Sequence, residues 1–224
     1  MKTAILVHGH FLGTPDWERV VWGNPAHGVY GNVPKGLVEA LRFDADTILF
    51  GTGASEKDGL NEGEYALKLA RERWREIPEF KSKDAGDVKA WLERCAVIES
   101  TAQNTPQEIV AGAQIARGRG AVRLIQIACR THSPRALRTA ISVLSANEDI
   151  RFFLDNFYSV TSDSKYDNGD IDDVVVIEPP HRPDRPHVFF NKTALMIVGH
   201  MNDARAQELD TALKSTIDEY RKTT

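Results

Sequence analysis

The chain of 224 residues lacks the marks of several large protein classes. It has only two cysteines, Cys95 and Cys129, which argues against a disulfide framework and fits a reducing cytoplasm. Each cysteine lies in or beside an apolar run, so we expect both to be small core residues. No stretch approaches the roughly 20 apolar residues of a membrane helix, and the first apolar run is too short for a signal peptide. A cytoplasmic protein without a membrane partner is therefore expected.

The chain also lacks an excess of basic residues. Its 28 lysines and arginines are outnumbered by 32 aspartates and glutamates, which gives a net charge of -4. This balance argues against a protein that binds nucleic-acid backbones, because such proteins usually display a basic face. It does not exclude a small anionic ligand held by a few local donors. With 42% hydrophobic residues, the composition is that of an ordinary globular protein.

What the chain does contain is a regular alternation of short apolar runs and amphipathic segments. Apolar runs typical of buried strands span residues 3–9, 46–53, 95–99, 122–129, 150–162 and 174–178. Helices are predicted between them over residues 34–43, 61–77, 105–120 and 133–146, with a further helix before residue 95. This order predicts a Rossmann-like α/β three-layer sandwich, with a mostly parallel sheet and helices on both faces.

We expect residues 1–224 to form a single domain, since this length suits one α/β unit. Residues 150–224 would complete the sheet and add a docking helix. Two segments interrupt the regular pattern. One is a long Gly-, Pro- and Asn-rich loop after the first strand, and loops of this length are often functional. The other is the Pro-rich stretch 179–187.

Two of the helices carry readable start signals. Thr105 can cap the helix that begins there, Pro106 fits the first turn, and Glu108 stands in the capping-box position. Ser133 can cap the next helix, with Pro134 as its first residue.

In an open parallel sheet the ligand binds outside the carboxyl ends of the strands. The residues directly after the predicted strands are rich in histidine, glutamate, amide and arginine side chains, more than solvation of loops requires. The candidate site residues at these strand ends are His8, Gly9, His10, Gly51, Thr52, Gly53, Glu99, Asn104, Thr105, His132 and Arg135.

Each of these residues has a functional and a structural interpretation. His132 can act as a general acid or base, or can simply precede a helix. Arg135 can grip a phosphate or carboxylate with its planar guanidinium. Gly51 and Gly53 can let backbone N–H groups approach a phosphate closely, or can simply permit a tight turn. His8 and His10 alternate on an extended chain, so at most one of them would face a given ligand.

Several diagnostic motifs are absent from the sequence. There is no G-x-G-x-x-G dinucleotide fingerprint, no G-x-S-x-G nucleophile elbow and no Walker motif. A divalent metal is a conceivable cofactor, but no pair of histidines or acids has a diagnostic spacing such as H-E-x-x-H. The sequence therefore assigns no metal ligand.

Four segments in the same order resemble the YdcF-like family, which includes SanA and ElyC. They are "AILVHGH", "ILFGTGASEKDGLNEGEYAL", "IESTAQNTPQEI" and "IACRTHSPRALRTA". The last two are the specific ones, and they match the family pattern at Glu99, Asn104, Thr105, Glu108, His132, Arg135 and Ala136. Glu64 stands near the acid of the family's Ser-Glu-Ala motif, although here no serine precedes it directly. "GTG" also replaces the family's Ser-Gly-Gly.

The resemblance covers residues from about 3 to 145 and implies a Rossmann-like fold. The function that it implies is loosely defined. One family member is reported to bind S-adenosylmethionine, and others are tied to the cell envelope through membrane anchors. S-adenosylmethionine is therefore a candidate cofactor or ligand.

Together, the residues and the resemblance favour an enzyme acting on a small nucleotide-like or phosphorylated ligand. Arg135, the start of the Thr105 helix and the turn from Gly51 to Gly53 would hold its anion. His132, with Glu99 or Glu64, would move protons during hydrolysis or group transfer at a phosphoryl or glycosyl bond. Two alternatives stay open: a protein that binds S-adenosylmethionine or a nucleotide without hydrolysis, and an interaction module that uses residues 179–187. The oligomeric state is not predicted.

Overall fold

The computed structural model describes residues 1–15 and 17–165. The described residues do not include the predicted sixth strand over residues 174–178, the Pro-rich stretch 179–187 or the predicted docking helix. Whether residues 166–224 add to the sheet therefore stays a prediction. The same holds for the docking helix.

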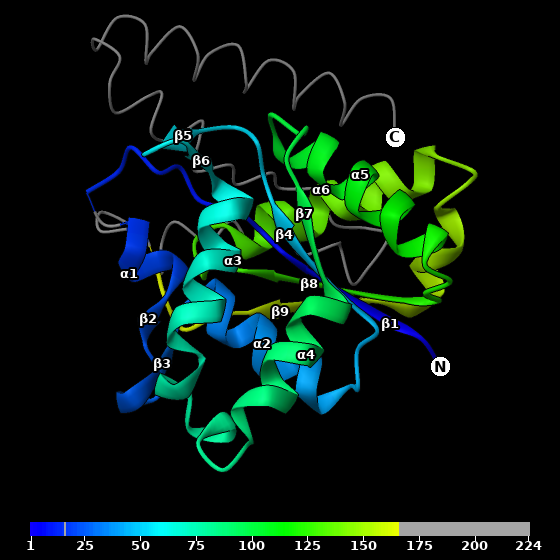
Figure 1. Ribbon diagram of the computed structural model, residues 1–224. Coiled ribbons are helices and arrows are strands. Elements are labelled where there is room, and N and C mark those ends of the chain that lie inside the picture. The colour runs from blue at the N-terminus through cyan, green and yellow to red at the C-terminus, as the bar shows by residue number, and fades with distance from the viewer. Residues whose placement is uncertain (16, 166–224) are drawn as a thin grey trace, which may run out of the picture. The chain divides into compact units, whose positions relative to one another are not determined.

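A five-stranded sheet, parallel throughout, forms the centre of the fold, and its strands lie in the order β7-β4-β1-β8-β9 (Figure 1). The strands are β1 (Thr3–Val7), β4 (Thr47–Gly51), β7 (Ala96–Glu99), β8 (Arg123–Ala128) and β9 (Phe157–Thr161). Numbered along the chain, this order is 3-2-1-4-5, so the direction of winding reverses between β1 and β8. That reversal is the topological switch point at which open α/β sheets bind ligands.

Five longer helices cover the two faces of the sheet. They are α2 (Asn32–Arg42), α3 (Glu62–Arg73), α4 (Ala85–Cys95), α5 (Thr105–Gly118) and α6 (Ser133–Ala146). The first three contribute to one hydrophobic cluster and the last two to the other. The predicted Rossmann-like three-layer α/β fold, with helices on both faces, is confirmed.

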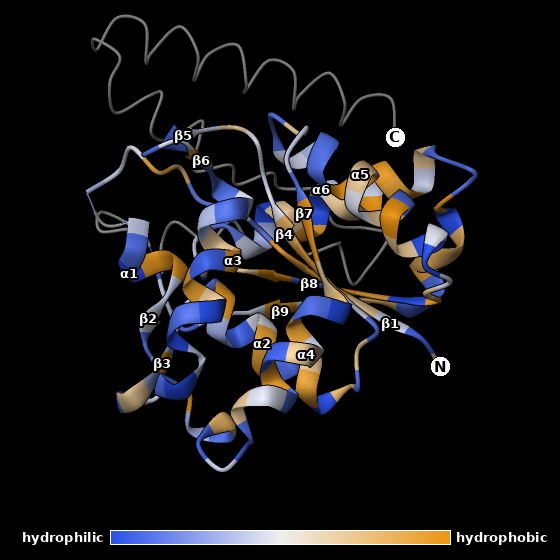
Figure 2. Ribbon diagram, in the orientation of Figure 1, coloured by the Kyte–Doolittle hydropathy of each residue, from blue (hydrophilic) through white to orange (hydrophobic). Residues whose placement is uncertain are grey.

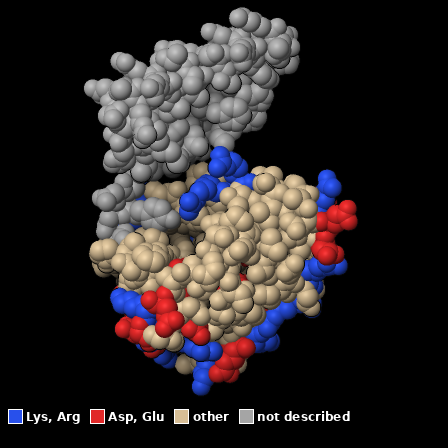
Figure 3. Space-filling view, turned by 90° about the horizontal axis from the view of Figure 1, so that it is seen from above, with Lys and Arg blue, Asp and Glu red and all other residues tan. Residues whose placement is uncertain are grey.

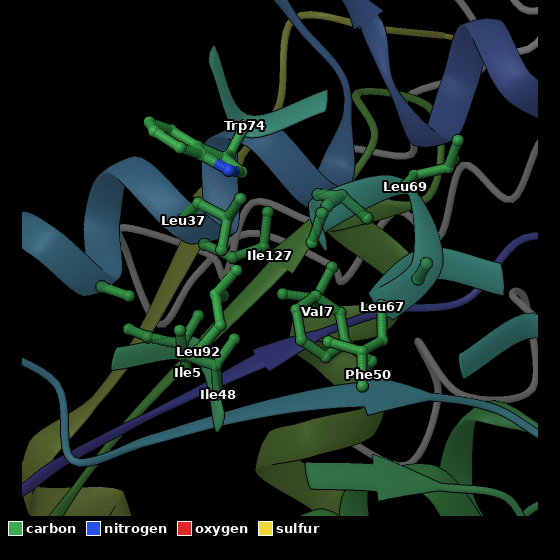
Figure 4. Close-up of a cluster of buried hydrophobic side chains, with 14 of the residues drawn as sticks. Ile5, Val7, Leu37, Ile48, Phe50, Leu67, Leu69, Trp74, Leu92 and Ile127 are labelled. Atoms are coloured by element: carbon green, nitrogen blue, oxygen red, sulfur yellow. The ribbon is translucent and has the colours of Figure 1, made fainter. Parts of the chain in front are cut away.

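The two clusters follow from the alternation of side chains along each buried strand. Ile5 and Val7 of β1 face the cluster with α2, α3 and α4, whereas Ala4 and Leu6 face the cluster with α5 and α6. Figure 4 shows the first cluster, with Ile48 and Phe50 of β4 among Leu37, Leu67, Leu69 and Leu92 of the helices. In Figure 2 the central strands are mostly orange, and each helix has blue segments as well as orange ones. Burial on both faces explains why the strands read as continuous apolar runs.

The long loop after β1 contains several short elements of regular structure. It holds α1 (Trp17–Val21) and a hairpin of β2 (Gly23–Asn24) and β3 (Val29–Tyr30) around the 3₁₀ turn η1 (Pro25–His27). A second short hairpin, β5 (Glu56–Lys57) with β6 (Leu60–Asn61), leads into α3. The 3₁₀ turns η2 (Trp74–Glu76) and η3 (Pro78–Phe80) lie between α3 and α4.

Three local predictions need correction. The fifth strand is confined to Phe157–Thr161, because residues Arg151–Asn156 form the 3₁₀ helix η4, which buries Phe153. Helix α5 is capped by Asn104, whose side chain accepts a hydrogen bond from the Gln107 backbone N–H, so Thr105 is its first residue. Helix α6 has His132 in the cap position, and Ser133 is its first residue.

Cys95 and Cys129 are both buried and unpaired, which confirms that they serve as small core residues. Within residues 1–15 and 17–165, no helix has the length and apolar character needed to cross a membrane. On the face seen in Figure 3, basic and acidic side chains of the described residues are interspersed along the rim. The middle of that face is mostly uncharged, so this view shows no continuous basic surface among the described residues.

Candidate functional site

A cleft of about 700 Å³ lies where β1, β4 and β8 end, at the switch point of the sheet. The loop after β1 lines it with Gly9, His10, Phe11, Thr14 and Pro15. The β4 end and the starts of α3, α5 and α6 supply Thr52, Ala54, Glu62, Asn104, Thr105, Glu108, His132 and Arg135. Seven of the predicted site residues therefore share one cleft: Gly9, His10, Thr52, Asn104, Thr105, His132 and Arg135.

His132 is a buried histidine held in place by Arg135, which lies one helical turn further on. The guanidinium donates to Nδ1 of His132 from Nε at 3.3 Å and from Nη2 at 3.0 Å. Burial lowers the pKa of His132 well below its ordinary value, and the nearby charges of His8, Arg135 and His10 lower it further. A neutral imidazole that accepts at Nδ1 carries its proton on Nε2. His132 is thereby set up as a hydrogen-bond donor.

Glu62, the first residue of α3, is one of two buried carboxylates that line the cleft. Its Oε2 accepts a hydrogen bond from the Thr52 hydroxyl at 3.0 Å, and its Oε1 accepts one from the Ser55 hydroxyl at 2.6 Å. Burial raises the pKa of Glu62 more than these two hydrogen bonds lower it, and the Glu108 carboxylate raises it further. A carboxyl group with a raised pKa is suited to proton transfer near neutral pH.

Glu108 forms the floor of the cleft and pairs with His8, the first residue after β1. His8 Nδ1 lies 2.6 Å from Glu108 Oε2, and both side chains are almost completely buried. The second carboxylate oxygen, Oε1, accepts a hydrogen bond from the Gly9 backbone N–H at 3.2 Å. Glu108 was expected to complete a capping box with Thr105. The structure corrects this, because the side chain turns inward to His8, 100 residues away in the sequence.

His8 itself lies behind the cleft rather than on its wall. Its Nε2 is 3.1 Å from Oε1 of Gln126, and the Gln126 amide nitrogen donates to the Ser159 hydroxyl at 2.9 Å. Burial lowers the pKa of His8, but Glu108 and the hydrogen bonds to Glu108 and Gln126 raise it more, so that it lies above its ordinary value. The ring of His8 meets the ring of His132 edge-on, with centroids 5.5 Å apart.

The two glycines after β4 make room for protein atoms rather than lining the cleft. A Cβ on Gly51 would lie 2.1 Å from Oε1 of Glu108, and one on Gly53 would lie 1.9 Å from the Ser100 carbonyl oxygen. The peptide bond between Gly51 and Thr52 is cis. Gly51 and Gly53 are therefore needed for close packing against α5 and the loop after β7, and their role in phosphate binding stays a prediction.

Glu64 and Glu99, the two acids expected to move protons, do not line the cleft. Glu64 completes a capping box with Asn61: its carboxylate accepts from the Asn61 N–H, while the Asn61 side chain accepts from the Glu64 N–H. Glu99 is buried, and its Oε1 accepts three hydrogen bonds from the backbone and hydroxyl of Thr101 and the backbone of Ala102. Both acids thus hold local turns, and Glu62 and Glu108 take their place at the cleft.

Sequence reasoning missed Glu62 and Glu108 as cleft residues. For Glu62 a signal was present, because Asn61 and Glu64 have the spacing of a capping box, which leaves Glu62 free of a capping role. For Glu108 no local signal existed, since its partners His8 and Gly9 lie on another strand end. The part of the chain that the structure describes contains no group of three or more His, Cys, Asp or Glu side chains that could hold a metal ion.

Replacing Asn104 by alanine should destabilise the protein by about 1 kcal/mol, because the cap of α5 is lost. Urea unfolding measures this free energy. Thr105→Ala is the matched control and should cost less than half as much, since Thr105 occupies the first helical position rather than the cap. Equal losses in the two variants would contradict the assignment of the cap to Asn104.

Comparisons of the chain with protein-family models, with curated proteins and with solved structures gave no match. The resemblance to the YdcF-like family therefore stays a prediction.

Proposed function

We propose that the chain is a small-molecule enzyme that carries out hydrolysis or group transfer on a nucleotide-like or phosphorylated ligand bound in the cleft. The observation that carries this proposal is that one cleft joins Glu62, His132 and Arg135. Burial raises the pKa of Glu62 and lowers that of His132. Titratable groups with perturbed pKa values that share a cleft are typical of functional sites.

The three side chains suit separate roles. Arg135 would bind the anionic group of the ligand, helped by the backbone N–H of Thr105 at the start of α5. His132, with its proton on Nε2, would donate a hydrogen bond to the oxygen that gains negative charge. Glu62 would accept the proton of the attacking water or hydroxyl as the new O–P bond forms. That proton would then pass to the leaving oxygen as its bond to phosphorus breaks.

A panel of phosphate monoesters and nucleotides tests this proposal, with release of phosphate or of the leaving alcohol as the readout. Arg135→Gln should raise KM roughly 10- to 100-fold, the effect of losing a hydrogen bond between charged groups. Arg138→Gln is the control, because Arg138 is an exposed arginine on the same helix and does not line the cleft. An equal effect of both substitutions, or no turnover of any phosphorylated compound, would count against the proposal.

Binding without hydrolysis is a second candidate, favoured by the mouth of the cleft. Phe11 lines the mouth and is 58% exposed, so it offers a flat aromatic surface to the base of a nucleotide or of S-adenosylmethionine. Thermal unfolding with and without these ligands separates the candidates. A rise in Tm with S-adenosylmethionine, without turnover of the phosphorylated compounds, would favour binding alone. An interaction role for residues 179–187 would instead be supported if deleting them abolished partner binding.

A further inference from the structure

Both ring nitrogens of His8 face oxygen acceptors. Nδ1 is 2.6 Å from Oε2 of Glu108, and Nε2 is 3.1 Å from Oε1 of Gln126. A neutral imidazole has a single N–H and can donate only one of these hydrogen bonds. An imidazolium donates both.

In the structure the Gln126 amide presents its oxygen to His8 and its nitrogen to Ser159. Gln126 of β8 pairs with Ser159 of β9, and its amide nitrogen donates to the Ser159 hydroxyl at 2.9 Å. The Ser159 hydroxyl lies 3.4 Å from that of Ser133, which in turn accepts from the Thr161 hydroxyl at 3.0 Å. With its nitrogen bound to Ser159, the Gln126 amide offers its oxygen as the second acceptor for His8.

The surroundings of His8 also favour a cation. The Glu108 carboxylate beside it is buried, and a buried carboxylate is costly unless a positive charge accompanies it. Three elements bring other charged or titratable groups to the pair and to His132. They are α6 with His132 and Arg135, α3 with Glu62, and the loop after β1 with His10. The positive charge on His8 therefore has one close anionic partner, and the His132 ring lies against it edge-on.

We propose that His8 is a positioning residue. As a protonated imidazolium it fixes the Glu108 carboxylate at the floor of the cleft and keeps His132 neutral, with its single ring proton on Nε2. The use of that proton as a donor to the ligand rests on the proposed function, whereas the protonation states of the two rings do not. The two claims can therefore fail separately.

Nitrogen NMR of the full chain, labelled with ¹⁵N-histidine, reads these states directly without a substrate. From about pH 6 to about pH 8, the range in which free histidine loses its charge, both nitrogens of His8 should stay protonated. His132 should show one protonated nitrogen, Nε2, over the same range. Single substitutions of each histidine by glutamine assign the signals, and the urea-unfolded chain is the reference. A single protonated nitrogen on His8, or a proton on Nδ1 of His132, would overturn the proposal.

A second measurement tests whether His8 acts on His132. The double variant His8→Gln, Glu108→Gln replaces the ion pair by neutral amides of similar size. The titration midpoint of His132 should then rise by about one pH unit or more, because a nearby like charge has been removed. Gln126→Met removes only the second acceptor of His8, so the midpoint of His132 should shift less than in the double variant. An unchanged midpoint in the folded double variant would show that His8 only fills space, and if that variant does not fold, the wild-type spectrum alone decides.

Discussion

Replacing Glu62 by glutamine should lower kcat/KM for the identified substrate roughly 100- to 10,000-fold, the usual contribution of a general acid or base. Glutamine keeps the size of the side chain, and its amide can still meet the hydroxyls of Thr52 and Ser55. The fold should therefore survive while proton transfer is lost. Steady-state kinetics, with circular dichroism to confirm folding, measures both effects.

Glu64→Gln is the matched control, since Glu64 lies two residues further along the same helix. This variant should keep nearly full turnover and lose at most about 1 kcal/mol of stability, because its carboxylate serves the capping box at Asn61. A large loss of turnover in Glu64→Gln with none in Glu62→Gln would restore the assignment suggested by the sequence.

The pH profile gives the direction of proton transfer by Glu62. Burial raises the pKa of this carboxyl above its ordinary value. If Glu62 accepts the proton, kcat/KM should rise with pH through that raised pKa and level off above it. The rising limb should be missing from the profile of Glu62→Gln. A profile that falls over the same range would make Glu62 the proton donor instead.

Replacing Glu108 by alanine should destabilise the protein by about 3–5 kcal/mol, because it leaves the His8 imidazolium buried without its partner. The loss also frees the Gly9 N–H and opens space against Gly51. Urea unfolding measures the free energy, and an insoluble variant would itself agree with a loss of this size.

The double variant His8→Leu, Glu108→Leu is the control for the destabilisation expected in Glu108→Ala. Replacing both partners by apolar side chains removes the ion pair without leaving a buried charge, so the double variant should be more stable than Glu108→Ala. If Glu108→Ala cost less than about 1 kcal/mol, the value of a surface pair, the buried ion pair would not exist in solution.

The fold could be predicted from the sequence because its signals are local. Strands such as Thr3–Val7 are buried on both faces and therefore read as apolar runs, and the helices between them show their own periodicity. The alternation of the two limits the topology to a parallel sheet with right-handed crossovers. Such reasoning failed at residues Arg151–Asn156, where an apolar run forms a 3₁₀ helix. A short apolar run alone does not separate a buried helix from a strand.

The site was predictable in place but not in detail. Parallel strands bring their carboxyl ends to one edge of the sheet. Residues such as His132 and Arg135 could therefore be assigned to the cleft simply because they follow a predicted strand in the chain. Which acid joins them depends on where each side chain points. Glu64 turns back to Asn61 and Glu99 to its own turn, whereas Glu62 reaches the cleft.

By itself, therefore, the sequence determined the α/β class and the alternation of the main strands and helices along the chain. It also determined the edge of the sheet at which a ligand would bind. Only the tertiary structure decided that the Glu108 side chain pairs with His8 instead of capping its own helix. It also decided that residue 51 must be glycine to leave room for that side chain. The physical reason is distance along the chain. Secondary structure depends on residues a few positions apart, whereas the hydrogen bond between His8 and Glu108 joins residues 100 positions apart and exists only after the sheet has formed.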